Sequence, residues 1–361
     1  MGAPASPYSD LEPRAFWRSA VTDREPLDPG DVYRPKFPIT RDMRIATAGS
    51  CFAQHVGRAL KTAGFNVIDT EPMPLDVDLT LAQRYGYELY SARYGNIYTT
   101  RQLMQLVEEA RGKVTPAHRV WERDGRYVDA QRPSIEPDGF DSPEAVLAHR
   151  ERHLINVRKA FFRCDLMVFT FGLTEAWIDR ESGTVYPTAP GTIAGRHDDA
   201  VFGFHNYRYD EIKRDFETFM ALMRARNKDV RFLITTSPVP LTATASGHHV
   251  EVATCYSKSV LRAVCGALAD ANDDVDYFPS YEIITSANTR GVYYETNKRT
   301  VSRLGVQTAM NTFMAAHGAA PSADAAPSGG GAEKTAPRRA RAGGARADDV
   351  CEDALLEAFS R

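Results

Sequence analysis

The sequence has no long apolar run and few cysteines, and both absences exclude classes of protein. No stretch approaches about 18 continuous apolar residues, the length that a transmembrane helix needs. Residues 1–10 are polar and contain prolines, unlike the apolar centre of a signal peptide. The five cysteines form no CxxC pair, and none lies at metal-ligand spacing from a histidine. We therefore expect a cytoplasmic protein that binds no metal and no cofactor.

An excess of positive charge is also missing. Lysine and arginine total 44 against 47 acidic residues, which gives a net charge of −3 and a pI near 6.3. This balance argues against nucleic acid or an anionic membrane surface as a partner. With 361 residues, 43% of them hydrophobic, the chain can bury a sizeable core. These numbers leave the oligomeric state open.

Composition divides the chain into four parts. Residues 1–40 are rich in proline, and we expect an extended arm that packs Phe16-Trp17 onto the main domain. Residues 41–317 carry the alternating patterns of a globular domain. Residues 318–349 are mainly Ala, Pro, Gly and Arg, which predicts a disordered linker. Residues 350–361 regain helical periodicity and predict a short helix that docks back on the body.

The clearest local signal is a strand that runs into a helix. Ile45–Gly49 reads as a buried strand, and a helical pattern follows from Phe52 to Gly64. A second strand near 65–68 completes a β-α-β unit, which implies parallel pairing. Ser50 lies at the turn, near the positive end of the helix dipole, where a nucleophile and a developing oxyanion are both favoured. On geometry alone, a helix cap is the commoner role for such a serine.

Further apolar runs extend the predicted parallel sheet. Asp165–Phe171 is almost continuously apolar, as expected for a central strand, and 230–236 and 275–278 have the same character. Ligands of open α/β sheets bind at the carboxyl ends of the strands, so the loop Gly172–Glu175 is expected beside Ser50. Gly95-Asn96 precedes another helix, where it forms either an oxyanion-binding loop or a plain turn.

The remaining segments carry weaker signals. Hairpins are predicted at 119–130 and 177–186, around Asp-Gly and Ser-Gly turns. An irregular connection at 187–206 is typical of a binding loop or lid. His149 and His153 lie four residues apart on a long helix that begins after Ser142. Because no third ligand accompanies them, a solvated helix face is the favoured interpretation.

Several short segments resemble the GSCFA family. Gly49-Ser50-Cys51-Phe52-Ala53 spells the motif that names it. The other matching segments, in order, are Tyr94–Tyr98, Phe171–Trp177, Thr236–Leu241, Tyr256–Ser259 and Tyr277–Glu282. The family in turn resembles the SGNH (GDSL-like) hydrolases. That resemblance implies an α/β fold: a three-layer αβα sandwich with a mainly parallel central sheet.

The same resemblance implies a set of site residues. Ser50 matches the nucleophile, and the Ser50 N–H, Gly95 and Thr174 match an oxyanion hole. Asn96 belongs to the same loop as Gly95. Thr174 stands where the hydrolases carry an amide side chain, and its hydroxyl can donate one hydrogen bond. Gly172, Thr174 and Glu175 are expected to bind substrate.

The general base is absent from its expected position. SGNH hydrolases carry Asp-x-x-His ahead of the last helix, and this chain has Asn297 and Thr300 there. A serine without a base is a weak nucleophile. The candidate replacements, in order of preference, are His249, His205 and His55. The candidate orienting carboxylates are Glu282 and Glu175.

Two functions follow from this reasoning. One is a serine esterase or O-acyltransferase that acts on an acylated carbohydrate or another small hydroxyl compound through a Ser50 acyl-enzyme. The alternative is a catalytically silent SGNH-like domain that binds a glycan or a protein partner. The intact strand–serine–helix motif favours the enzyme, and the missing Asp-x-x-His favours the silent domain.

Overall fold

The computed structural model describes residues 6–318 and Leu356, and its core is a four-stranded parallel sheet. The strand order is β1 (Ile45–Gly49), β4 (Leu166–Phe171), β8 (Arg231–Thr236) and β9 (Val275–Tyr277). The strand predicted at 65–68 is reduced to one parallel bridge, between Ile45 and Val67. That bridge lies on the free side of β1 and extends the sheet by a fragment.

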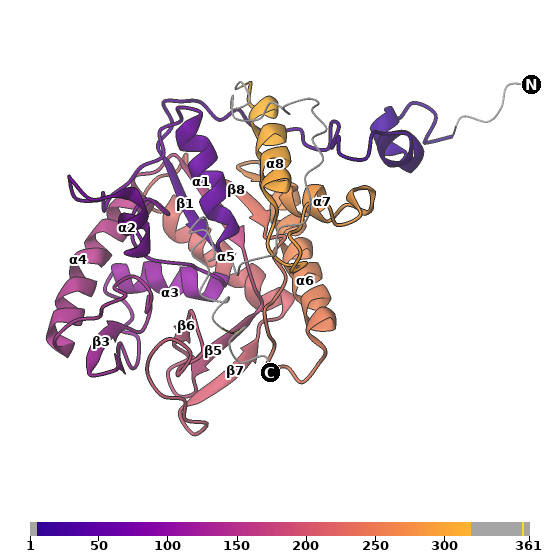
Figure 1. Cartoon of the computed structure of the whole chain (residues 1–361). Coiled ribbons are helices and arrows are strands. Elements are labelled where there is room, and N and C mark those ends of the chain that lie inside the picture. Colours follow the sequence, from indigo (N-terminus) through magenta and orange to yellow (C-terminus); the bar gives the residue numbers. More distant parts are fainter. Residues whose placement is uncertain (1–5, 319–355, 357–361) are drawn as a thin grey trace, which may run out of the picture.

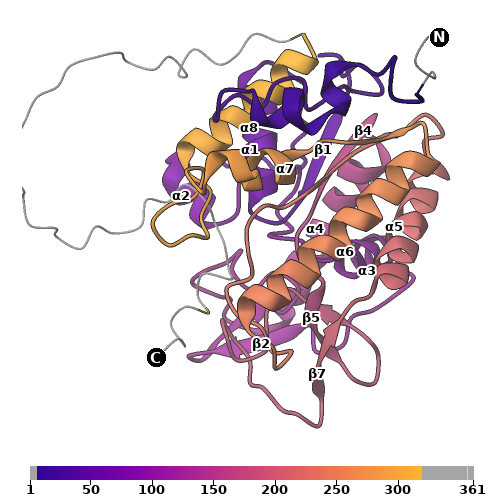
Figure 2. The same cartoon turned by 90° about the vertical axis from the view of Figure 1, so that its right-hand side faces the viewer.

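Helices cover both faces of the sheet because the strands bury both sets of alternating side chains. Ile45, Leu166 and Leu233 pack in one apolar cluster, whereas Ala46, Met167 and Phe232 pack in another. The first cluster is covered by α1 (Phe52–Thr62), α7 (Ser280–Thr285) and α8 (Arg303–Ala316). The second is covered by α3 (Thr100–Ala110), α4 (Pro143–Phe162), α5 (Tyr209–Arg224) and α6 (Val250–Ala271). Figures 1 and 2 show this arrangement, which confirms the predicted three-layer α/β/α fold.

The strand order changes direction between β1 and β4. After β1 the chain passes through α1 to the bridge segment on one side, and it later returns on the other side as β4. In open α/β sheets, a crevice forms at the carboxyl ends of the two strands that flank such a switch point. Gly49 and Phe171 end these two strands, so Ser50 and Gly172 are the first residues at that edge.

Two small antiparallel sheets lie outside the core. The hairpin predicted at 119–130 is confirmed by β2 (Val120–Arg123) and β3 (Arg126–Asp129), with φ values of 51° and 73° at Asp124 and Gly125. The second sheet has the order β6-β5-β7, and Figure 1 shows it below the parallel sheet. Its strands are β5 (Glu175–Asp179), β6 (Val185–Tyr186) and β7 (Phe202–Asn206). The prediction of an irregular loop over 187–206 is therefore wrong at its end, because β7 pairs with β5.

The N-terminal arm packs through aromatic residues other than the predicted ones. Phe16 and Trp17 are 40% and 72% exposed, so the expectation that they pack on the domain is wrong. Tyr33 and Phe37 are buried instead, and the Tyr33 hydroxyl donates to Asp276 at 2.8 Å. Short helical turns at Pro13–Ala15 and Arg18–Thr22 hold Phe16 and Trp17 away from the core. The predicted linker and C-terminal helix lie outside the described residues, except for Gly318 and Leu356.

The predicted solvated face of α4 is wrong as well. His153 is fully buried, and its Nδ1 lies 2.7 Å from a Glu71 carboxylate oxygen. His149 is half-buried and accepts a hydrogen bond from Arg132 at 2.8 Å. Burial, together with the positive charge of Arg132, lowers the pKa of His153 to about 3 and that of His149 to about 4. The residues that cover this face, Glu71 and Arg132, lie in segments without a helical or strand pattern. The pattern of the α4 sequence alone therefore gave the wrong prediction.

Of the helices in the described part of the chain, none combines the length and the apolar character that crossing a bilayer requires.

Candidate active site

Close approach of two strands fixes the turn that carries Ser50. Gly49 has φ of 140°, and a Cβ added there would lie 2.6 Å from the backbone oxygen of Thr170 on β4. Only glycine fits this position, since no side chain can occupy space already filled by a neighbouring backbone. The chain then enters α1, so Ser50 stands between the strand end and the first helical turn.

The Ser50 side chain does not cap the helix. Cys51 holds the cap position, and its side chain makes no capping hydrogen bond. Ser50 is 3% exposed, and its Oγ has no hydrogen-bond partner among the described residues. An unpartnered buried hydroxyl costs about 1–3 kcal/mol, so its retention points to a role other than stability. The helix-cap alternative is therefore wrong.

The loop that holds Gly95 and Asn96 lies against the Ser50 turn. The N–H of Ile97 donates to the Gly49 carbonyl at 2.8 Å, and the Tyr90 hydroxyl lies 3.1 Å from the Ser50 carbonyl oxygen. The Asn96 side-chain oxygen accepts from Tyr90 at 2.5 Å and from Gln54 at 3.3 Å. Two donors on the oxygen fix the orientation of the amide, with its NH₂ group as the donor for further partners. The predicted proximity of this loop to Ser50 is observed.

Gly172 touches the Ser50 side chain from the β4 side. A Cβ added to Gly172 would lie 2.9 Å from Ser50 Cβ, 3.3 Å from Ser50 Oγ and 3.0 Å from the Tyr98 carbonyl oxygen. The N–H of Leu173 donates to that same carbonyl at 2.9 Å. The segments of Ser50, Asn96 and Gly172 therefore meet, and the expectation that the loop after β4 lies beside Ser50 is confirmed.

Helix α6 holds the Gly172–Glu175 loop in place. Lys258 is 1% exposed, and its Nζ donates to the Gly172 carbonyl at 2.7 Å. The buried hydroxyl oxygen of Ser257 accepts the N–H of Thr174 at 3.1 Å. A buried ammonium donates a strong, charge-assisted hydrogen bond, so the loop backbone is tied firmly to α6.

Ser257 and Lys258 were not predicted as site residues, although their spacing on α6 indicates that both face the core. Leu261 and Cys265 are buried apolar residues of α6. Ser257 lies four residues before Leu261, and Lys258 lies seven before Cys265, so both polar residues fall on the core-facing stripe. Polar residues on such a stripe need partners inside the protein.

The side chains of Thr174 and Glu175 lie in different surroundings. Thr174 is fully buried, and its Oγ1 has no partner among the described residues. Glu175 begins β5 and accepts a hydrogen bond from the Thr244 hydroxyl at 2.7 Å. Burial raises the pKa of Glu175, although the Thr244 bond acts in the opposite direction.

The first two of the three candidate bases, and one of the orienting carboxylates, have partners away from Ser50. His249 is exposed and caps α6, where its Nδ1 accepts the N–H of Glu251 at 3.2 Å. His205 lies in β7, with its Nε2 3.0 Å from Glu211. Glu282 binds Arg262 and accepts from the Tyr277 hydroxyl. Since Ser50 Oγ has no partner in the described part, the structure does not join either ring to it.

The segment ahead of α8, where Asp-x-x-His would stand, does reach the correct edge of the sheet. The Tyr294 hydroxyl donates to the Pro238 carbonyl at 2.8 Å, and Arg299 donates to Pro240 at 3.2 Å, just after β8. Asn297 and Thr300 are hydrogen bonded to each other at 2.9 Å. The side chains of Asn297 and Thr300 are neither acid nor base.

Within residues 6–318, no three His, Cys, Asp or Glu side chains gather in a way that could hold a metal ion. The fold and this edge instead define an α/β protein of the open-sheet class, with an unpartnered serine hydroxyl at the topological switch point.

Comparison with known proteins identifies the family of this chain. The GSCFA family matches residues 44–313, which include β1 and most of α8. The chain belongs to the GSCFA family. A search of curated proteins finds none that matches.

Proposed function

We propose that this protein is a serine esterase or O-acyltransferase of the SGNH (GDSL-like) type. The observation that carries the proposal is the Ser50 hydroxyl: buried, without a partner among the described residues, and in contact with Gly172 at the switch point. Serines kept at a cost in stability at such an edge are typical of nucleophiles. The proposed substrate is an acylated carbohydrate or another small acylated hydroxyl compound.

In the proposed reaction, Ser50 Oγ attacks the ester carbonyl while a base takes its proton. In this proposal the oxyanion is held by the Ser50 N–H, Gly95 and Thr174, beside the positive end of the α1 dipole. The alcohol leaves with a proton and an acyl-enzyme remains. Water or an acceptor hydroxyl then attacks the acyl carbon and releases Ser50.

The proposed base is a histidine that takes the proton of Ser50 Oγ. His249 is the first candidate and His205 the second, and either ring must leave its present partner to reach Ser50. Glu282 would orient the base only after release from Arg262. Because Ser50 is 3% exposed, substrate entry also requires movement of the residues that cover it. The proposal keeps a cytoplasmic location, in line with Cys164 and Cys265, which form no disulfide among the described residues.

Hydrolysis of p-nitrophenyl acetate tests the proposal. We expect turnover by the full-length protein, loss of it in Ser50→Ala, and retention in Ser280→Ala. Ser280 is the matched control because it is fully buried at the start of α7, with a hydroxyl that bonds to Thr235 at 2.6 Å. Equal rates in wild type and Ser50→Ala would refute the enzyme.

The second candidate is a catalytically silent SGNH-like domain that binds a glycan or a protein partner. The observation in its favour is the Asn297–Thr300 pair at the place of the usual acid and histidine. This candidate predicts no turnover of any ester, with an intact fold in both serine variants.

A further inference from the structure

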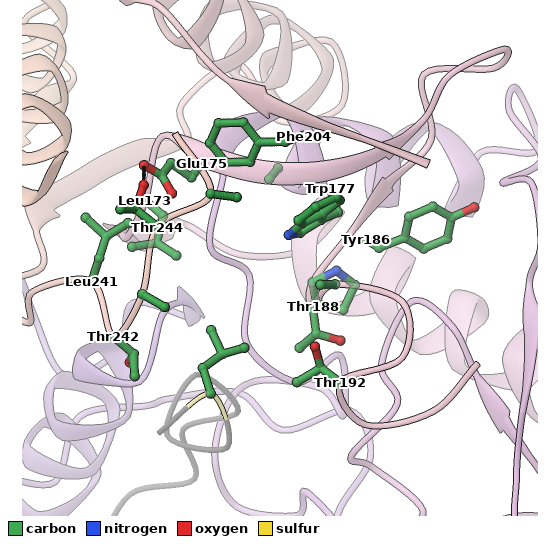
Figure 3. A pocket seen from close by; sticks show the side chains of 16 residues that line it. Leu173, Glu175, Trp177, Tyr186, Thr188, Thr192, Phe204, Leu241, Thr242 and Thr244 are labelled. Carbon is green, nitrogen blue, oxygen red and sulfur yellow. Dashed lines mark hydrogen bonds between the residues drawn. The ribbon is translucent and has the colours of Figure 1, made fainter. Parts of the chain in front are cut away.

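A cavity of about 200 Å³ opens next to the candidate active site (Figure 3). It lies between the loop after β4, the β5-β6-β7 sheet and residues 241–245, and Leu356 forms part of its wall. Leu173 is the link to the active site, since it lines the cavity and directly follows Gly172. We call this cavity the Trp177 pocket.

The wall of the Trp177 pocket combines aromatic rings with hydroxyl groups. Figure 3 shows Trp177 and Phe204 along one side, with Thr188 and Thr242 on other sides. Thr188 is 8% exposed, and its Oγ1 has no hydrogen-bond partner among the described residues. The Thr242 Oγ1 is also buried and unpartnered there. Two such hydroxyls in one cavity indicate that a ligand supplies their partners.

Charge narrows the class of ligand. Among the described residues that line the pocket there is no lysine, arginine or histidine, and Glu175 carries the one ionisable carboxyl group. An anion such as a phosphate or a carboxylate would therefore meet no positive charge and would be repelled by Glu175. One Glu175 oxygen accepts from Thr244, and a carboxylate has further acceptor positions for ligand hydroxyls.

The size and the polarity of the pocket restrict the class of ligand further. An engineered apolar cavity of about 150 Å³ binds benzene, so about 200 Å³ suits one six-membered ring with substituents. A plain alkyl chain would fill the space but would leave the hydroxyls of Thr188 and Thr242 desolvated without partners, at about 1–3 kcal/mol for each hydroxyl. A ring with an apolar face and hydroxyls at its edge can pack on the aromatic side chains and form hydrogen bonds with the polar side chains of the pocket.

We propose that the Trp177 pocket binds a pyranose ring, with the C–H face on Trp177 and Phe204 and the hydroxyls on Thr188, Thr242 and Glu175. The assignment of this sugar as the alcohol half of an ester attacked by Ser50 rests on the proposed function. The binding site itself does not, because the pocket residues do not include Ser50.

The test uses full-length Ser50→Ala protein, so that binding is measured without turnover. Methyl β-D-glucopyranoside, methyl β-D-galactopyranoside, cyclohexanol and hexanoate are titrated, with saturation-transfer NMR as the readout. We expect a glycoside to bind with a Kd in the millimolar range and more tightly than the other two probes. Thr188→Val, in that background, should weaken glycoside binding about 3- to 10-fold, the value of one hydrogen bond.

Thr47→Val is the matched control, since Thr47 is also buried with an unpartnered hydroxyl but lies in β1, outside the pocket. It should leave glycoside binding unchanged, and neither valine variant should lose stability. The inference is overturned if neither glycoside binds, if cyclohexanol or hexanoate binds as tightly, or if Thr188→Val has no effect. If glycosides bind to Ser50→Ala but wild type releases no acetate from an acetylated methyl glycoside, the pocket stands and the proposed function fails.

Discussion

Replacement of Gly172 by alanine places a methyl group against the Ser50 side chain. The added carbon would lie 2.9 Å from Ser50 Cβ and 3.0 Å from the Tyr98 carbonyl oxygen. The backbone of Gly172 is not in the left-handed region, so the cost comes from steric contact alone. Overpacking of a tight core costs about 1–3 kcal/mol, and we expect Gly172→Ala to lose that amount of unfolding free energy. The shift of Ser50 should also slow its reaction with a fluorophosphonate probe.

Gly266→Ala is the control for this prediction. Its added carbon meets the end of the Arg262 side chain at 2.9 Å, and a flexible side chain can move aside. Alanine within α6 gains up to about 1 kcal/mol in helix propensity, so this variant should be as stable as wild type or more stable. Urea denaturation and the rate of probe labelling measure both effects. A Gly172→Ala variant that is as stable as Gly266→Ala and is labelled at the wild-type rate would contradict the steric contact with Ser50.

Three further predictions concern the same framework. Lys258→Met removes a buried donor to the loop beside the serine, and it should cost about 1–3 kcal/mol in urea denaturation and slow labelling; unchanged labelling would contradict this role. Gly49→Ala should prevent folding, as seen by circular dichroism, whereas Gly125→Ala, in open space at a turn, should cost only about 1–2 kcal/mol. The pKa values of His149 and His153 are depressed by burial, so the unfolded chain takes up their protons first as the pH falls. Their stabilisation is complete above pH 6.5 and is lost progressively towards pH 3–4, by roughly 2 kcal/mol at pH 5 for the fully buried His153 and by less for the half-buried, solvent-screened His149. Denaturation from pH 7 to 5 measures this loss, and a flat profile would contradict it.

The elements at the centre of the sheet were predictable from sequence because their signals are local. The Ile45–Gly49 strand, the turn at Ser50 and the helix from Phe52 follow from a short apolar run, a glycine and a 3.6-residue period. The apolar run of β4 predicted a central strand, and its carboxyl end predicted that Gly172 would approach Ser50. Parallel sheets bring the ends of their strands together, so topology converts local signals into a site.

The parts that could not be predicted depend on contacts between distant segments. Nothing in the sequence around His153 indicates that Glu71 will pack against its side chain. Phe16 and Trp17 look like anchors, but the turns around them leave both exposed. The inward placement of Lys258 was detectable from helix spacing, whereas its acceptor, the Gly172 carbonyl, required the fold.

The most direct test of the central claim is the site of covalent labelling. The full-length protein is treated with a fluorophosphonate, digested, and mapped by mass spectrometry. We expect an adduct on the oxygen of Ser50 that is absent in Ser50→Ala and retained in Ser280→Ala. Absence of an adduct in the folded wild-type protein, or the same labelling in Ser50→Ala, would contradict the assignment of Ser50 as a nucleophile.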